Sequence, residues 1–193
     1  MNPVTHFFIG WSALERFQVS HRDRTLVVLA GLAPDLDGLG LVVDFVTRNT
    51  DLPDTGYYQA FHRMYGHGLP AAIVFSIIVA LLADSKLRAG IFAFISVHLH
   101  FVSDLLGSRG PQPEDIWPIY YFAPLDDRWP VAWAGQWPLV SWQNTTITII
   151  LLALTFALAI NRGYTPLAIF SVKGDNRVME VLRKHWNALR RHD

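Results

Sequence analysis

Apolar residues along the chain gather in runs that are separated by short polar breaks. Residues 5–19 place apolar side chains at helical spacing, and a second run, 25–33, follows a polar break and meets Pro34, which ends or kinks a helix. The run 145–160 is the longest in the chain. Because no stretch alternates apolar and polar residues as a strand does, we expect an all-α fold.

Two further runs predict a helical hairpin. Residues 69–83 and 89–102 are apolar and flank the polar turn 84–88. As helices they would bring His67, at the start of the first, close to His98, His100 and Asp104, at the end of the second. Three imidazoles and a carboxylate would then meet at the open end of the hairpin.

The remaining segments are less regular. Residues 35–66 read as loop or short helix, and residues 107–142 are rich in Pro, Gly and Trp. Residues 176–191 predict a basic amphipathic helix, which most simply lies on anionic lipid. We therefore expect one domain, 1–165, followed by a basic tail with an amphipathic helix, 166–193.

The composition points to a membrane. Hydrophobic residues make up 51% of the chain, charged residues only 17%, and the mean hydropathy is +0.24. The best candidate span is 145–160, yet no run reaches about 20 uninterrupted apolar residues, so spanning the bilayer and sitting on it both stay open. The tryptophans between 117 and 142 suit an interfacial belt or, alternatively, an aromatic core.

Charge and cysteine content exclude some classes of protein. The net charge is zero, so we expect no nucleic-acid partner of the usual basic kind. The chain has no cysteine, so a metal site must use nitrogen and oxygen ligands. The first residues lack a basic segment and a cleavage motif, so we expect no removable signal peptide.

Lysines and arginines are distributed unequally between the two ends of the expected helices. Twelve fall at the end that holds residues 20–24, 84–88 and the tail, and four (Arg48, Arg63, Arg109 and Arg128) fall at the other. The positive-inside rule then predicts a multi-pass protein of the bacterial inner membrane with a cytoplasmic C-terminus. The histidines and aspartates of interest lie at the end that is poor in positive charge, away from the cytoplasm.

His100 and Asp104 are four residues apart, so they share a helix face and can chelate one ion. Taken alone, such a pair can equally be a hydrogen-bonded pair of the core. His6, Asp35 and His67 supply the same ligand chemistry from other fragments at the same end, although the segment around Asp35 also reads as a turn with a helix cap. Buried histidine and aspartate are costly unless something binds them, which favours a metal.

Three neighbouring residues extend this group. Four roles stay open for His62: it could bind the metal, donate a hydrogen bond to one of the metal ligands, contact a phosphate, or be an exposed loop histidine. Asp37, like Asp35, is a possible general base, and Arg63 is a rare cation that suits a phosphate or carboxylate substrate. His98 lies two residues from His100 and points elsewhere.

The motifs of this chain resemble those of the bacterial membrane-bound metal-dependent hydrolases. The matching segments are Thr5-His6, Pro34-Asp35-Leu36-Asp37, His62-Arg63-x-x-Gly66-His67, His100-x-x-x-Asp104 and the stretch from Trp117-Pro118 to Asp126-Asp127-Arg128. That family is similar to zinc-dependent phospholipases C and single-strand-specific zinc nucleases. The resemblance implies a phospholipase C-like helical bundle with one to three Zn²⁺ or other divalent ions. By it, Asp35, His67, His100 and Asp104 hold one metal, and His6 joins Asp104 on another.

The expected function is therefore a metal-dependent hydrolase, a phosphoesterase that attacks a lipid or lipid-linked phosphate with metal-activated water. The alternatives are a membrane transporter whose His/Asp cluster conducts ions, and a non-catalytic membrane protein with a structural metal. Metal ligands at helix ends and the lack of an internal repeat weigh against a transporter. The oligomeric state stays open.

Overall fold

The computed structural model describes residues 1–14, 17–62 and 64–189. Helices account for 66% of the described residues and strands for 7%, so the mostly helical prediction is confirmed while a strictly all-α fold is wrong. In chain order the elements are α1 (Pro3–Ala13), α2 (His21–Leu32), the 3₁₀ helix η1 (Ala33–Leu39), α3 (Gly40–Arg48), α4 (Tyr57–Phe61), α5 (Leu69–Leu82), α6 (Lys86–Gly107), β1 (Ile119–Phe122), β2 (Asp126–Val131), α7 (Trp142–Arg162), the 3₁₀ helix η2 (Pro166–Ile169) and α8 (Val172–Leu189).

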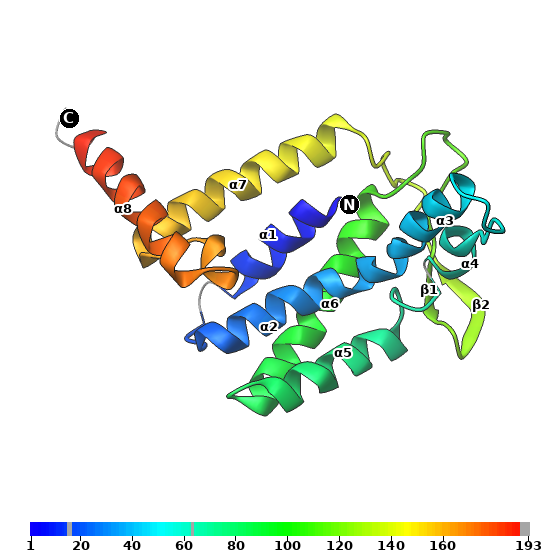
Figure 1. The fold of residues 1–193 in the computed structure, drawn as a ribbon, viewed down its shortest axis with the longest axis horizontal. Coiled ribbons are helices and arrows are strands. Elements are labelled where there is room, and N and C mark those ends of the chain that lie inside the picture. The colour runs from blue at the N-terminus through cyan, green and yellow to red at the C-terminus, as the bar shows by residue number, and fades with distance from the viewer. Residues whose placement is uncertain (15–16, 63, 190–193) are drawn as a thin grey trace.

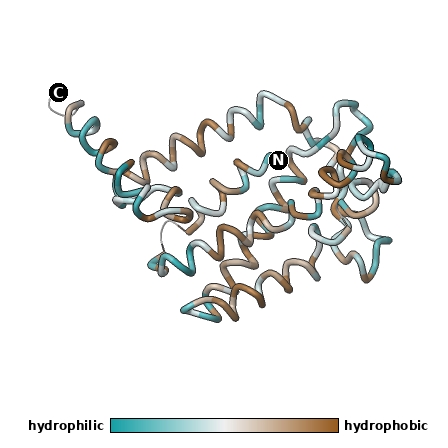
Figure 2. The backbone as a smooth tube through the Cα atoms, in the orientation of Figure 1, coloured by the Kyte–Doolittle hydropathy of each residue, from teal (hydrophilic) through white to brown (hydrophobic). Residues whose placement is uncertain are grey.

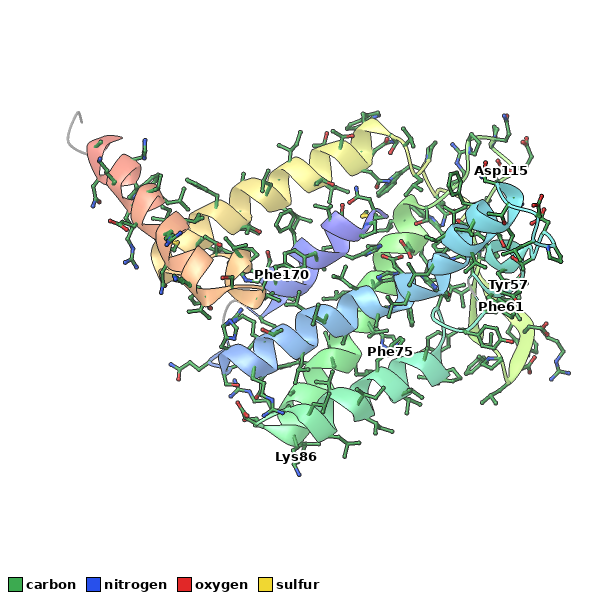
Figure 3. The ribbon with its side chains drawn as sticks, in the orientation of Figure 1. Tyr57, Phe61, Phe75, Lys86, Asp115 and Phe170 are labelled. Carbon is green, nitrogen blue, oxygen red and sulfur yellow. The ribbon has the colours of Figure 1, made fainter. Side chains whose placement is uncertain are left out.

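The bundle is organised around α6. This helix packs against α5, α2 and α1, and α7 covers the far side of α1 (Figure 1). The predicted hairpin of α5 and α6 is present, and its connecting turn lies at the opposite end of the bundle from the N-terminus and the β-hairpin. Figure 3 shows this polarity in two labelled residues, with Lys86 at one end and Asp115 at the other.

The core forms where α1, α2 and α6 meet. Trp11, Val28, Ala93 and Val97 are completely buried there. Small residues allow the helices to approach closely: a Cβ at Gly31 would overlap with the hydroxyl of Ser96 on α6. The backbone of α2 therefore lies directly against α6, which has consequences for the site described below.

The segment around Pro34 continues as helix instead of becoming a loop. α2, η1 and α3 follow one another without a break and form one helical stretch from His21 to Arg48. Pro34 stands at the junction of α2 and η1, where its missing N–H interrupts the α-helical hydrogen bonds and the chain continues as a 3₁₀ helix. The buried carboxylate of Asp44 then holds α3 to α4, accepting from the backbone N–H groups of Tyr57 (2.7 Å) and Tyr58 (2.9 Å).

The two strands form an antiparallel hairpin in the segment that was expected to be irregular. Ile119 pairs with Val131 and Phe122 with Asp126, with an irregularity between Tyr120 and Phe122. The strands escaped the sequence pattern because they are short and most of β2 is exposed on both faces. Long-range contacts hold the hairpin: the Tyr121 hydroxyl lies 2.9 Å from His98 Nε2 on α6.

Among the described residues, three helical segments are long and apolar enough to cross a membrane: His21–Arg48, Lys86–Gly107 and Trp142–Arg162. The last contains the run 145–160 that the sequence favoured. Its outward side chains are apolar, with Ile149 60% and Leu152 54% exposed. Figure 2 shows the hydrophobic helices of the bundle beside a more hydrophilic α8. An apolar exterior of this kind suits a lipid surrounding.

The C-terminal segment is anchored at its beginning. Asp175, in the first turn of α8, is buried and accepts from the backbone N–H of Thr165 (2.9 Å). The Nε2 atom of His21 lies 2.7 Å from the carbonyl oxygen of Ala168, which ties η2 to the start of α2. The tail therefore begins packed against the bundle, and α8 extends away from it in Figure 1.

Candidate metal centre

Four of the six predicted metal ligands form one compact group. His6 comes from α1, Asp35 from η1, and His100 and Asp104 from α6. Each offers one ligand atom, and these atoms all lie within 4.8 Å of one another. His6, His100 and Asp104 are at most 2% exposed, whereas the side chain of Asp35 is 25% exposed. The group is thus buried on three sides and reaches solvent at Asp35.

His67 borders this group from the loop that precedes α5. Its Nε2 atom lies 3.1 Å from His100 Nε2 and 3.4 Å from Asp104 Oδ2. Asp104 is central, because its Oδ2 is also 3.1 Å from His100 Nε2 and its Oδ1 is 3.2 Å from His6 Nε2. Asp35 Oδ1 lies 3.7 Å from His100 Nε2. Three imidazoles therefore turn the same ring nitrogen toward one carboxylate.

A backbone carbonyl fixes the orientation of His100. Its Nδ1 lies 2.9 Å from the carbonyl oxygen of Gly31 on α2. A carbonyl only accepts, so Nδ1 carries the proton and a neutral ring presents the Nε2 lone pair to the group. The contact exists because Gly31 has no side chain and lets α2 approach α6 at Ser96.

His67 and His6 are oriented in the same way by other acceptors. His67 Nδ1 lies 2.9 Å from the Asp37 carboxylate. His6 Nδ1 lies 3.0 Å from the hydroxyl of Ser103, which itself donates to the carbonyl of His100 (2.8 Å) and so accepts from the ring. Acceptors on Nδ1 are what metal-ligating histidines usually have, because they fix the tautomer and raise ligand basicity.

Several hydrogen-bond acceptor atoms at the centre of the group have no donor as a partner. His6 Nε2, Asp35 Oδ2 and Asp104 Oδ2 are buried and have no hydrogen-bond partner. The other oxygen of Asp104 accepts from the amino group of Met1 and from the Ser108 hydroxyl (2.8 Å). Nitrogen lone pairs and carboxylates facing one another need a positive charge between them. The residues therefore fit a divalent cation, and the donor set of imidazole and carboxylate suits Zn²⁺.

The same crowding alters the pKa values of the histidines outside the long helices. Burial by itself would lower the pKa of His67, but its contacts with Asp104 and Asp37 outweigh burial and raise the pKa to about 9. Burial dominates at His6 and lowers its pKa, even though Asp104 acts in the opposite direction. Without a metal, a proton retained by His67 therefore adds positive charge to the cluster beside the amino group of Met1.

The other predicted site residues lie behind or away from this group. Asp37, a predicted general base, accepts from His62 Nδ1 (2.8 Å), His67 Nδ1 (2.9 Å) and the backbone N–H of Gly66 (3.2 Å). His62, a predicted ligand, contacts Asp37 and stacks on Tyr58 instead of joining the four-residue group. Asp37 thus positions two histidines. Arg63 lies outside the described residues.

Three further histidine and aspartate residues lie away from the group. His98 points away from the group, with Nδ1 2.8 Å from the Phe94 carbonyl and Nε2 on Tyr121. Asp126 pairs with Arg128 (2.8 Å) on the exposed strand β2. Asp115 accepts from the backbone N–H of Gln112 (3.0 Å). His98 and these two carboxylates are not members of the cluster.

Sequence reasoning missed the residues that orient the ligands. Ser103 stands next to Asp104 and, as a polar residue in an apolar helix, was a usable signal. Gly31 contributes only a carbonyl, which no sequence pattern reveals. Gln136 was also missed. It is buried and donates to the carbonyls of Asp104 (2.9 Å) and Trp117 (3.2 Å). These bonds hold the loop after the β-hairpin against the end of α6.

Comparison with known proteins corrects the relationship inferred from the motifs. No curated protein and no solved structure matches the chain. The sequence model of one family, described as YdjM inner membrane protein, matches residues 1–173. The assignment to the bacterial membrane-bound metal-dependent hydrolases, with its phospholipase C and nuclease relatives, is therefore wrong, because short His/Asp motifs recur in unrelated sites while the family match covers most of the chain. The prediction of an inner-membrane location is confirmed. The chain belongs to the YdjM inner membrane protein family.

Proposed function

We propose that this protein is a metal-dependent hydrolase of the inner membrane that cleaves an ester of a lipid or lipid-linked phosphate. One observation carries the proposal. The Nε2 atoms of His6, His67 and His100 converge on Asp104, and each ring has an acceptor on Nδ1. A cluster prepared in this way is typical of a metal centre and is costly as a metal-free core.

A divalent ion held there would lower the pKa of bound water and polarise a phosphoryl oxygen. The protein supplies the rest. Asp104 and the three histidines hold the ion, and Asp37 and Ser103 keep two of the rings in place. Asp35 is the candidate general base, since it stands at the solvent-facing side and its Oδ2 has no partner. Asp37 is unsuited to that role because its oxygens are occupied by two imidazoles and an N–H.

The depth of the cluster supports a lipid substrate. Asp104 lies three residues before the end of α6, about 5 Å from that end along the helix axis. At the same end of the bundle the indoles of Trp129 (67% exposed) and Trp142 (74% exposed) face outward. Exposed tryptophans mark the headgroup level of a bilayer. An ester bond at that level would reach the cluster without crossing the hydrocarbon.

Metal analysis and turnover measured on the same preparation test the proposal. The full-length protein would be purified in detergent, its metal content determined, and phosphate or headgroup release followed from phospholipid nanodiscs. We expect bound divalent metal, turnover that stops on chelation, and recovery when Zn²⁺ is restored. Protein that never binds a divalent ion, with or without added Zn²⁺, would refute the metal centre. Bound metal without turnover on any phospholipid would refute the hydrolase.

A structural ion is a second candidate, and the number of donors favours it. Three histidines and two carboxylates are enough to fill a tetrahedral shell with no position left for water. In that case chelation lowers the unfolding temperature but no substrate is consumed. The partial exposure of Asp35 favours the catalytic reading, because a carboxylate at the solvent-facing side that serves as general base and not as a ligand leaves access to the ion.

A further inference from the structure

An open cavity of about 810 Å³ lies beside the metal cluster, where α6 ends. Its walls come from α4, from the segment after α6 and from the loop before α7. The lining residues used in the argument below are Ser108, Arg109, Asp115, Leu139 and Val140. A space of this size accommodates a small ligand or the headgroup region of a lipid.

Ser108 connects the cavity to the cluster. It lines the cavity, and its hydroxyl donates to Asp104 Oδ1 (2.8 Å). A molecule in the cavity is therefore separated from the central carboxylate by a single side chain. The next residue, Arg109, also lines the cavity. Arg109 directly follows Ser108 in the chain, so a group bound by Arg109 would lie close to the hydrogen bond between Ser108 and Asp104.

The Arg109 guanidinium has unused donors. Nη1 donates to the carbonyl of Gln112 (2.9 Å), while Nε is buried without a hydrogen-bond partner. Within the described ranges, Arg109 forms no ion pair with a carboxylate. Its backbone is fixed by Trp137 and Leu139, through N–H to carbonyl bonds of 3.2 and 2.8 Å. A partly exposed guanidinium that has no carboxylate partner and stands on a fixed backbone suits an oxyanion, which a guanidinium can bind through two parallel N–H donors.

The cavity rim beside Arg109 is apolar. Val140 is 94% exposed and Leu139 is 45% exposed. Exposed branched side chains next to a cation match a ligand with an anionic head and an apolar remainder. The exposed tryptophans at this end of the bundle place the cavity at the same headgroup level.

We propose that this cavity is a phosphate-binding subsite in which Arg109 holds a phosphate group. The role in turnover rests on the proposed hydrolase function, since the subsite would place the phosphate of a substrate next to the metal cluster. The anion can belong to a phospholipid or to a free phosphate ester. Leu139 and Val140 predict that the lipid binds more tightly, because they can contact its apolar part.

The carboxylate of Asp115 makes it possible to test whether charge in the cavity governs anion binding. It lines the same cavity, and its Oδ2 accepts from the backbone N–H of Gln112, whose carbonyl accepts from Arg109. An anion in the cavity is repelled by this charge and attracted by Arg109. Asp115→Asn keeps an oxygen that can accept the N–H bond and removes the negative charge, so it should strengthen anion binding.

Binding without turnover tests the subsite. The full-length protein, treated with chelator so that no metal can hold phosphate, would be titrated with glycerol 3-phosphate and, separately, with nanodiscs that contain phosphatidic acid. Nanodiscs with diacylglycerol at the same content lack the phosphate. The variants are Arg109→Gln, Arg109→Lys and Asp115→Asn, with Arg128→Gln as the matched control, because Arg128 is an exposed arginine already paired with Asp126.

We expect phosphatidic acid to bind more tightly than glycerol 3-phosphate, and diacylglycerol not to bind. Arg109→Gln should weaken phosphate binding at least tenfold, Arg109→Lys less, and Asp115→Asn should tighten it about threefold. Arg128→Gln should match the unmodified protein. Equal binding by Arg109→Gln and the unmodified protein, or no phosphate binding at all, overturns the proposal. If Arg109→Gln does not fold, Arg109→Lys and Asp115→Asn test the proposal instead. Phosphate binding that is unchanged in both of these variants refutes it. Because no metal or turnover is involved, failure of the hydrolase assay leaves this result unaffected.

Discussion

The Nε2 atoms of His67 and His100 face each other across 3.1 Å, although the two rings come from different segments of the chain. His100 donates from Nδ1 to the Gly31 carbonyl, so its Nε2 has no proton while the ring is neutral. His67 likewise directs Nδ1 at the Asp37 carboxylate. Two lone pairs cannot remain this close unless a proton or a metal ion lies between them. The pair therefore explains the fit to a cation, while the contacts of His67 with Asp104 and Asp37 raise its pKa.

Asp104→Ala should abolish bound metal and hydrolysis together. Asp104 contacts all three inward-facing rings, so its removal takes away the carboxylate that they share and leaves any remaining ion with an uncompensated charge. Metal content and turnover of the purified variant provide the measurement. The loss should exceed the roughly 10–100-fold that is typical of residues that only orient a ligand.

His98→Ala is the matched control on the same helix. Its ring contacts Phe94 and Tyr121 and stays outside the cluster, so metal content should be unchanged and substantial turnover should remain. Some loss of stability is expected from the broken contact with β1. A variant at His98 that lost more metal than Asp104→Ala would mean that the ligand set is wrong.

Asp37→Asn should weaken metal binding by about 10–100-fold while leaving the ligands themselves intact. Asp37 accepts from both His62 and His67, and an asparagine side chain has one oxygen, so it can serve only one of the two rings. Competition with a chelator of known affinity measures the change. Asp126→Asn, which disrupts an exposed pair, serves as the control and should have no effect. Unchanged affinity in Asp37→Asn would show that this contact does not hold His67 in place.

The pKa of His67 predicts how pH acts on the metal-free protein. The folded-state pKa is about 9 and the ordinary value is 6.5, so the protonated ring is favoured by folding. Its contribution to stability is complete below pH 6.5 and is lost as the pH rises through 9. Thermal unfolding of chelator-treated protein between pH 6 and 10 should therefore show a decline that His67→Gln lacks. A variant with the same decline would assign it to another group.

Metal binding should show the opposite pH dependence. An ion can bind His67 only after the proton has left, so affinity should rise with pH by up to about tenfold per unit until the pH reaches 9. Titrations with Zn²⁺ in two buffers of different ionisation enthalpy would measure the released protons. Affinity that does not change with pH would exclude His67 as a ligand.

The orientation of the cluster can be tested with single cysteines, because the chain has none of its own. Ser85, in the turn between α5 and α6, and Glu114, in the loop after α6, are both exposed and lie at opposite ends of α6. The twelve-to-four distribution of lysine and arginine predicts that an impermeant reagent labels Glu114→Cys and not Ser85→Cys in intact cells. Labelling only at Ser85→Cys would place the cluster on the cytoplasmic side.

The sequence by itself determined the helices with strong apolar periodicity. It also determined that the candidate ligands His100 and Asp104 lie on the same helix. The hairpin of α5 and α6 follows from two apolar runs and a polar turn, and the common face of His100 and Asp104 follows from their four-residue spacing. Both depend on local geometry alone, which is why they were predictable. The same holds for α6 and α7, whose apolar runs 89–102 and 145–160 were expected to be helical, whereas the third long apolar stretch, His21–Arg48, runs past Pro34, where the sequence pattern had a helix end or kink.

Only the tertiary structure decided what each remaining side chain does. Asp35 and Asp37 stand two residues apart in η1, yet one joins the cluster and the other supports it from behind, because their directions depend on what α6 and the loop before α5 bring near them. The acceptor of His100 is a carbonyl 69 residues away, which no side-chain pattern encodes. The β-hairpin and the cavity at Arg109 likewise depend on contacts between distant segments. Periodicity describes a regular element, whereas the direction of a side chain in an irregular one is set by its neighbours in space.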